Sequence, residues 1–188
     1  QIFEQVCIQA VRLIGTEGFI SINVSGRHFR SVDLDQRLLA LLDQYAVPTH
    51  CIHIEVTEHA LLENPTQVKQ MLQNLRDKGV GISLDDFGTG YSSLSYLHQY
   101  PFESLKIDRS FITELPLDDA ETQGLALVRA IQVLADSLHM KVIAEGIEHD
   151  SQRQALLRVG CRYGQGFLFA TPQPAGTWLS ADKPLLLA

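Results

Sequence analysis

The chain is 188 residues long, 45% of its residues are hydrophobic, and its formal net charge is −7. This length supports one sizeable core but not two comfortable domains, so we expect a single domain. The sequence has no block of like charges and no apolar run near the ~18 residues of a membrane span, which argues against contacts with DNA, RNA or a membrane. We therefore expect a cytoplasmic domain, with any membrane anchor of a longer parent protein outside these residues.

The three cysteines, Cys7, Cys51 and Cys161, are odd in number and widely spaced. Without a CxxC pair they argue against a disulfide framework or a structural zinc site. The seven histidines form no HExxH or similar ligand pattern, so we interpret them as surface or structural residues.

Hydrophobic periodicity predicts six units in which a helix alternates with a short apolar strand. The predicted helices cover 2–13, 35–45, 65–78, 91–98, 120–138 and 151–159. The predicted strands cover 19–23, 51–56, 80–84, 104–107, 141–144 and 163–169. The third helix has the clearest limits, because Asn64 is a capping residue, Pro65 suits the first helical position and Gly79 suits the end. Residues 176–188 are predicted to be a C-terminal tail outside the domain of residues 1–175.

Three of the predicted helices have an apolar face that we expect to contact the core. The residues of these faces are Ile2, Val6, Ala10 and Leu13; Val68, Met71, Leu72 and Leu75; and Leu127, Ile131, Leu134 and Leu138. His139 stands where a glycine usually ends a helix.

Polar residues stand at the carboxyl ends of five different predicted strands. They are Asn23, Glu55, Asp85 with Asp86, Lys106 with Asp108, and Glu145. Alternating units imply a parallel sheet, either open or closed into a barrel. An open sheet would spread these side chains along a line, whereas a barrel brings them round one mouth, so their convergence favours the barrel.

The adjacent carboxylates Asp85 and Asp86 follow the third strand where a glycine-rich turn begins. Such a pair either stays in water as part of a loop or binds a cation that reverses the local charge balance. The oxygen ligands around the predicted mouth suit magnesium or manganese, with calcium as a non-productive substitute, and suit zinc or copper poorly. With two ions ~3.5–4 Å apart, Asp85 could bridge them, which is an arrangement used for in-line displacement at phosphorus.

Six short motifs, in the right order and over nearly the whole chain, resemble the EAL domains, which are cyclic di-GMP phosphodiesterases. The most diagnostic segment is 85–93, which reads DDFGTGYSS. The others are NVS at 23–25, EVTE at 55–58, LKID at 105–108, AEGIE at 144–148 and QGF at 165–167. The resemblance implies a modified TIM (β/α)8 barrel, of which this sequence supplies six of the eight units.

The resemblance also implies roles for individual residues in the hydrolysis of cyclic di-GMP to linear pGpG. Asn23, Glu55 and Asp85 would hold one divalent cation, Mg²⁺ or Mn²⁺, and Asp85, Asp86 and Glu145 the other, with Ca²⁺ as an inhibitor. Lys106 would position the attacking water, assisted by Gln165 and Glu148. The remaining residues of interest are Glu58 and Asp108, and Gly88, Thr89 and Gly90 in a loop that Glu58 would steady. The loop is expected to link substrate binding to a homodimer contact, and the parent protein to carry sensory or diguanylate cyclase-like domains.

The family's Glu-Ala-Leu signature, whose glutamate is a metal ligand, does not precede Asn23. A complete barrel has eight strands and typically ~250 residues. We therefore expect two strands, about 60 residues, to be missing from the amino-terminal side, and the activity of this piece alone is uncertain.

Three hypotheses about function remain. The first is a metal-dependent cyclic di-GMP phosphodiesterase. The second is a degenerate EAL domain that binds cyclic di-GMP without hydrolysing it. The third is an unrelated barrel enzyme using Lys106 as a Schiff-base amine, which the neighbouring acids oppose because they would keep the amine protonated.

Overall fold

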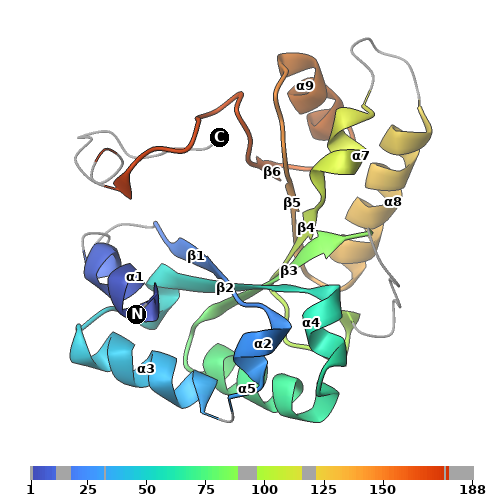
Figure 1. The fold of residues 1–188 in the computed structure, drawn as a ribbon. Helices are drawn as coiled ribbons and strands as arrows, with labels where there is room; N and C mark the ends of the chain where they lie inside the picture. Colours follow the sequence, from blue (N-terminus) through green and yellow to red (C-terminus); the bar gives the residue numbers. More distant parts are fainter. Residues whose placement is uncertain are drawn as a thin grey trace.

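The structure is a computed structural model that describes residues 2–11, 18–31, 33–88, 97–115, 122–175 and 177. Six strands form one sheet in sequence order, and every neighbouring pair is parallel. They are β1 (Ile20–Asn23), β2 (Ile52–Thr57), β3 (Gly81–Phe87), β4 (Ser104–Ile107), β5 (Lys141–Ala144) and β6 (Tyr163–Gly164). The sheet curls like an arc of a barrel (Figure 1), as the sequence predicts.

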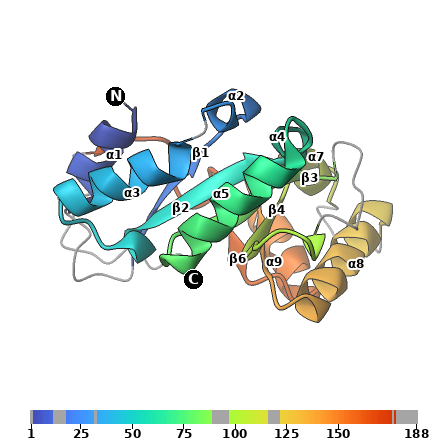
Figure 2. The ribbon, with the colours of Figure 1, turned by 90° about the horizontal axis from the view of Figure 1, so that it is seen from below.

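Helices connect the strands and cover the outer side of the curled sheet. The longer ones are α1 (Ile2–Ala10), α3 (Leu34–Gln44), α5 (Pro65–Asp77), α8 (Gln123–Ser137) and α9 (Asp150–Arg158). Helices α3 and α5 pack together beside β1–β3, whereas α8 and α9 pack together at the β4–β6 end (Figure 2). Short helices also follow the carboxyl ends of three strands: α2 (Gly26–Phe29), α4 (Glu58–Leu62) and α7 (Arg109–Thr113). The hydrophobic pattern did not predict α2 and α7, because four or five residues are too few to establish a helical period.

Alternation along the strands separates an apolar face from a polar one. Ile54, Leu84 and Leu105 lie in the core between the sheet and the helices, each almost fully buried. Residues one position away, such as Glu55 and Lys106, point to the opposite, concave face, because successive strand residues face opposite sides. The apolar face therefore holds the helices in place, and the concave face is left for polar side chains.

The predicted core face of α5 is confirmed, since its four apolar residues are all buried and Gly79 follows with a φ of +90°. The prediction for α8 is wrong at Leu127, which is 41% exposed. The buried stripe of that helix contains Leu125, Val128 and Ile131, and Leu127 lies well off this stripe at 100° per residue.

The predicted face of α1 is also wrong at Ile2, which is 64% exposed, whereas Cys7 and Ala10 are buried. Leu13 lies outside the described residues. His139, which stands where a glycine usually ends a helix, adopts the left-handed conformation after α8, with a φ of +58°.

The last strand is much shorter than the predicted 163–169. After Gly164 the chain leaves the sheet and follows the loop between β5 and α9: the Gln165 carbonyl accepts the Ile147 N–H at 3.1 Å, and Leu168 N–H donates to the Ile147 carbonyl at 2.9 Å. A Cβ atom at Gly166 would lie 2.2 Å from the Ile147 carbonyl oxygen, so only glycine permits this approach.

Some predictions concern residues that the structure does not describe. The predicted helix 91–98 lies almost wholly outside the described residues, as do Thr89, Gly90 and nearly all of the tail 176–188. Among the described helices, none combines the length and the apolar character that crossing a membrane requires.

Candidate metal centre

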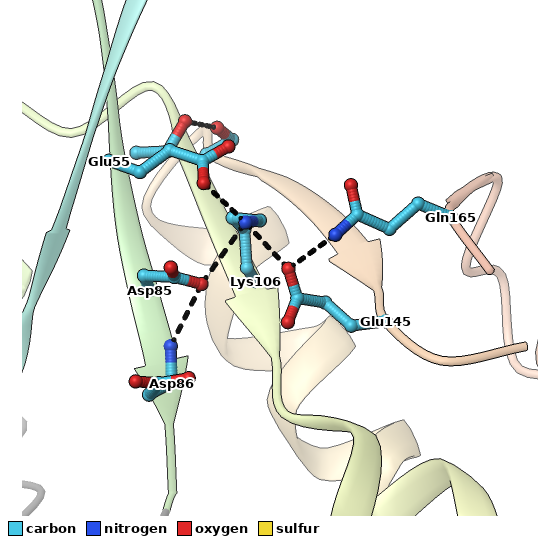
Figure 3. Close-up of polar contacts among 8 residues, drawn as sticks. Glu55, Asp85, Asp86, Lys106, Glu145 and Gln165 are labelled. Atoms are coloured by element: carbon cyan, nitrogen blue, oxygen red, sulfur yellow. Dashed lines mark hydrogen bonds and ion pairs between the residues drawn. The ribbon is translucent and has the colours of Figure 1, made fainter. Parts of the chain in front are cut away.

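Four ionisable side chains meet at the carboxyl end of the sheet, on its concave face. Glu55 comes from β2, Asp85 from β3, Lys106 from β4, and Glu145 from the residue directly after β5. Figure 3 shows all four pointing toward one another from neighbouring strands. The predicted convergence of these strand ends is therefore present in the structure.

Lys106 lies at the centre of this group. Its Nζ atom is 2.6 Å from Glu55 Oε2, 2.6 Å from Glu145 Oε1 and 3.2 Å from Asp85 Oδ1. Burial lowers the pKa of Lys106, but the hydrogen bonds to Glu145 and Glu55 outweigh burial, so its net pKa lies above the ordinary value. The side chain is thus an ammonium at neutral pH. This opposes the Schiff-base hypothesis, since an amine nucleophile must lose its proton.

The pair Asp85 and Asp86 lies inside β3 rather than in a turn after it. Asp85 is only 8% exposed, so the interpretation of the pair as a solvated turn is wrong. The pairing of β3 with β4 shifts register between Leu84 and Phe87, and Asp86 has a φ of +55°. Aspartate tolerates this left-handed conformation better than most residues.

A bulge re-aims side chains that would otherwise alternate across the strand. Its consequence is that Asp85, Asp86 and Glu145 each offer a carboxylate oxygen within 4.8 Å of the others. No second group of three acidic, histidine or cysteine side chains close enough to share an ion occurs among the residues that the structure describes.

The charge of this centre is unbalanced, because four carboxylates face one ammonium. Burial raises the pKa of Asp86, and the charge of Asp85 raises it further. Burial also raises the pKa of Glu145, although its hydrogen bond with Lys106 acts in the opposite direction. Both pKa values are raised chiefly because the carboxyl groups are buried, which disfavours their charged forms. Carboxylate oxygens without thiol or imidazole are the donors that hard divalent cations prefer. The residues present therefore fit a divalent cation.

Gln165 and Asn23 stand at opposite sides of the centre. Gln165 Nε2 donates to Glu145 Oε1 at 2.7 Å, so the glutamine contacts the cluster directly (Figure 3). Asn23 ends β1 and is the register partner of Glu55, which places it beside the cluster on the exposed rim.

Asp108 directly follows β4 and is the N-cap residue of α7. Its Oδ1 atom accepts the Ser110 N–H at 3.0 Å and the Ser110 hydroxyl, and so caps α7. The hydrogen bond from the Ser110 side chain is the main reason why the pKa of Asp108 lies below its ordinary value. Asp108 therefore shapes the helix after Lys106.

Glu58 lies in the first turn of α4 and accepts the Gly88 N–H with Oε1 at 3.3 Å. This contact joins Glu58 to the segment after Asp86. Glu148 is exposed and lines an open pocket of about 410 Å³ beside the cluster, together with Arg109, Gln165 and Phe167.

Sequence reasoning missed Gln152, a buried residue that hydrogen-bonds to the backbone of Glu148 and His149. A glutamine at the third position of a helix is a known capping signal, and it was available in the sequence.

Comparison with known proteins gives a consistent result. A model of the EAL domain family matches residues 1–172. The bifunctional diguanylate cyclase/cyclic di-GMP phosphodiesterase MucR of Pseudomonas aeruginosa is 43% identical over 163 residues, which are 86% of this chain and 23% of that protein. The chain spans about a fifth of the length of the curated relatives that it matches first.

Solved structures agree with the sequence matches. The PaMucR phosphodiesterase in its c-di-GMP complex has a TM-score of 0.85 and 37% identity, covering 94% of this chain and 77% of that chain. BlrP1 of Klebsiella pneumoniae, in a manganese/cy-diGMP complex, has a TM-score of 0.79 and 27% identity, covering 90% of this chain and 43% of that one. The fold is thus the curled, barrel-derived sheet of these domains, and the chain belongs to the EAL domain family.

Proposed function

We propose that this chain is the catalytic part of a phosphodiesterase that hydrolyses cyclic di-GMP to linear pGpG, using two divalent cations, Mg²⁺ or Mn²⁺. The observation that carries the proposal is the group formed by Asp85, Asp86 and Glu145, whose carboxylate oxygens lie within 4.8 Å of one another beside a single ammonium. The c-di-GMP complex of PaMucR and the manganese/cy-diGMP complex of BlrP1 support it, because both structures resemble this chain.

The proposed ligands divide into two overlapping sets. Asn23, Glu55 and Asp85 would hold one cation, and Asp85, Asp86 and Glu145 the other. When bound, such cations would polarise the scissile phosphate and lower the pKa of the water that they bind. We expect Ca²⁺ to bind but to inhibit, since its longer and more flexible coordination fits the same oxygens less strictly.

Other side chains of this protein would hold the carboxylate ligands in position and offset the negative charge of the phosphate. Lys106 donates to Glu55 and Glu145, and so fixes one oxygen of each carboxylate. Because its pKa is raised, Lys106 remains a cation that can position the attacking water and offset negative charge developing on the phosphate. Gln165 donates to the same Glu145 oxygen and limits rotation of that carboxylate. Glu148 lines the pocket, and we propose that it assists the water.

We also propose that the segment after Asp86, with Gly88, Thr89 and Gly90, couples the site to a homodimer contact. Its support is the hydrogen bond from Gly88 N–H to Glu58, which joins this segment to α4. The parent protein would carry sensory or cyclase-like domains, as the bifunctional name of MucR suggests for that relative.

The direct test is to incubate the complete protein that carries this chain with cyclic di-GMP and Mn²⁺, and to separate the products by chromatography. We expect linear pGpG with the wild type and none with Asp86→Asn. Glu103→Gln, at the opposite end of the sheet, is the matched control and should hydrolyse at the wild-type rate. Tight binding of cyclic di-GMP without formation of pGpG would contradict the proposed phosphodiesterase activity and favour the hypothesis of a non-hydrolytic receptor.

A further inference from the structure

Gln152 is a buried polar side chain that joins two segments flanking the metal centre. It lies in the first turn of α9 and is 4% exposed. Its Oε1 atom accepts the N–H groups of Glu148 at 2.9 Å and of His149 at 3.0 Å, and its Nε2 atom donates to the Ile112 carbonyl at 3.1 Å. The two N–H donors on one side and the carbonyl on the other allow only this orientation of the amide.

The contact with Ile112 goes beyond ordinary helix capping. A glutamine at the third helical position commonly accepts backbone N–H groups at the start of its own helix, and such a bond requires no other element. Ile112 belongs instead to α7, 40 residues earlier in the chain. The same side chain thus caps α9 and attaches it to α7.

These bonds complete a closed path around the centre. The chain runs from Lys106 in β4 through the N-cap residue Asp108 into α7. Hydrogen bonds of Gln152 then connect α7 to the loop that contains Glu145. The path closes where Glu145 meets Lys106 at 2.6 Å. Any shift of α7 against the loop would therefore change the position of the Glu145 carboxylate relative to the lysine.

Close packing between the two segments makes the path rigid. Gly146 has a φ of +72°, and a Cβ atom there would lie 2.5 Å from Arg109 Cβ in the first turn of α7. Glu145 N–H donates to the Ile107 carbonyl at 3.1 Å, so both ends of the loop are tied to the β4–α7 segment. The other end of the loop, at Glu148 and His149, is connected to α7 through the side chain of Gln152. No other side-chain hydrogen bond between these two places occurs among the described residues.

We propose that Gln152 is a positioning residue that holds the loop from Glu145 to Glu148 against α7 and thereby sets the affinity of the centre for divalent cations. It does not touch the cluster and acts through the backbone of the loop. The part of this inference that concerns cations rests on the proposed function, whereas the part that concerns the loop does not.

The test measures Mn²⁺ binding by calorimetry, without substrate, together with hydrogen exchange of the Glu148 and His149 amides. Gln152→Leu removes both arms of the side chain and should weaken Mn²⁺ affinity about tenfold, in the range found when groups supporting metal ligands are lost. It should also accelerate exchange at both amides. Gln152→Glu keeps the acceptor arm but places an oxygen against the Ile112 carbonyl, so it should weaken Mn²⁺ affinity while leaving the two amides protected.

Gln132→Leu is the matched control. Gln132 is also a buried glutamine, on the neighbouring α8, but its Nε2 atom donates within its own helix, to Asp136 at 2.8 Å. The control should leave Mn²⁺ affinity and the exchange of the Glu148 and His149 amides unchanged. Wild-type Mn²⁺ affinity in either folded Gln152 variant, or an equal loss of affinity in Gln132→Leu, would overturn the proposal. If the wild type binds no Mn²⁺, the proposed function fails, and the exchange rates alone decide whether Gln152 holds the loop.

Discussion

The two ends of the sheet carry charged clusters that differ in burial and in balance. At the amino end, Glu103 pairs with Arg76 at 3.1 Å and with Lys141 at 3.4 Å, and the two cations are 40% and 55% exposed. At the carboxyl end, Lys106 is 4% exposed and faces an excess of carboxylates. Water can compensate the first cluster but not the second. The difference teaches that buried, unbalanced negative charge favours the binding of a cation, whereas an exposed cluster of similar size is compensated by solvent.

The largest expected difference in stability comes from replacing one cation in each cluster by an uncharged residue. Lys106→Met leaves three carboxylates partly buried without their ammonium, and should lower the free energy of unfolding by about 3–5 kcal/mol in the absence of metal. Lys141→Met breaks an exposed pair and should lower it by less than about 1 kcal/mol. Urea denaturation of both variants measures the difference. Equal losses would mean that the two ends do not differ in the way proposed.

The next effect concerns metal binding. Asp86→Asn removes a negative charge but keeps a residue type that tolerates the left-handed backbone at this position. We expect Mn²⁺ affinity to fall by at least about tenfold, since the loss of a ligand should exceed that of a supporting group. The stability of the metal-free protein should rise, because the cost of burying the Asp86 charge and its repulsion from Asp85 are both removed. Calorimetric titration and denaturation measure the two quantities, and a stability loss with unchanged affinity would contradict the assignment.

A smaller effect is expected from the cap of α7. The Ser110 side-chain hydrogen bond keeps the pKa of Asp108 below its ordinary value of 3.8. The stabilisation is therefore present above pH ~4 and is lost as the pH falls through the lower, folded-state pKa. Asp108→Ala should be less stable than the wild type by about 1 kcal/mol at neutral pH, and the difference should shrink on acidification. Denaturation between neutral pH and pH ~2 measures it; a difference that is constant with pH would show that the charge plays no part.

The smallest effect belongs to the amino end. Glu103→Gln removes the anion shared by Arg76 and Lys141, and should change the free energy of unfolding by less than about 1 kcal/mol. High salt should reduce this change further, because exposed pairs are screened. A large change that persists in salt would show that this cluster also supports the fold.

Much of the fold could be predicted because its signals are local. Pro65 and Gly79 delimit α5, and the apolar runs of β4 and β5 have the predicted bounds. The face of α8 could not be assigned reliably, because Leu127 and Leu125 are both apolar and only tertiary packing selects between them. The end of β6 depends on contact with Ile147, which is distant in the sequence.

In the site, too, the features with local signals could be predicted and those that depend on tertiary contacts could not. The positions of Glu55, Asp85, Lys106 and Glu145 at or beside strand carboxyl ends were sufficient to predict that they meet, since parallel strands end at one edge. The bulge at Asp86 was not predictable, because it depends on the register between β3 and β4. The link from Gln152 to Ile112 was missed for a similar reason: a capping pattern predicts the bonds within α9 but not the partner on α7.

The central claim is that the buried negative charge at the carboxyl end of the sheet binds divalent cations. Its most direct test is thermal unfolding of the wild type, the Asp86→Asn/Glu145→Gln double variant and Glu103→Gln across a series of Mn²⁺ concentrations. A cation that binds only the folded state raises Tm as its concentration rises. We predict that Mn²⁺ raises the Tm of the wild type and of Glu103→Gln equally and raises the Tm of the double variant much less, because the double variant keeps only the ligand set of Asn23, Glu55 and Asp85. A wild-type Tm that does not respond to Mn²⁺, or a double variant that responds like the wild type, would contradict the claim.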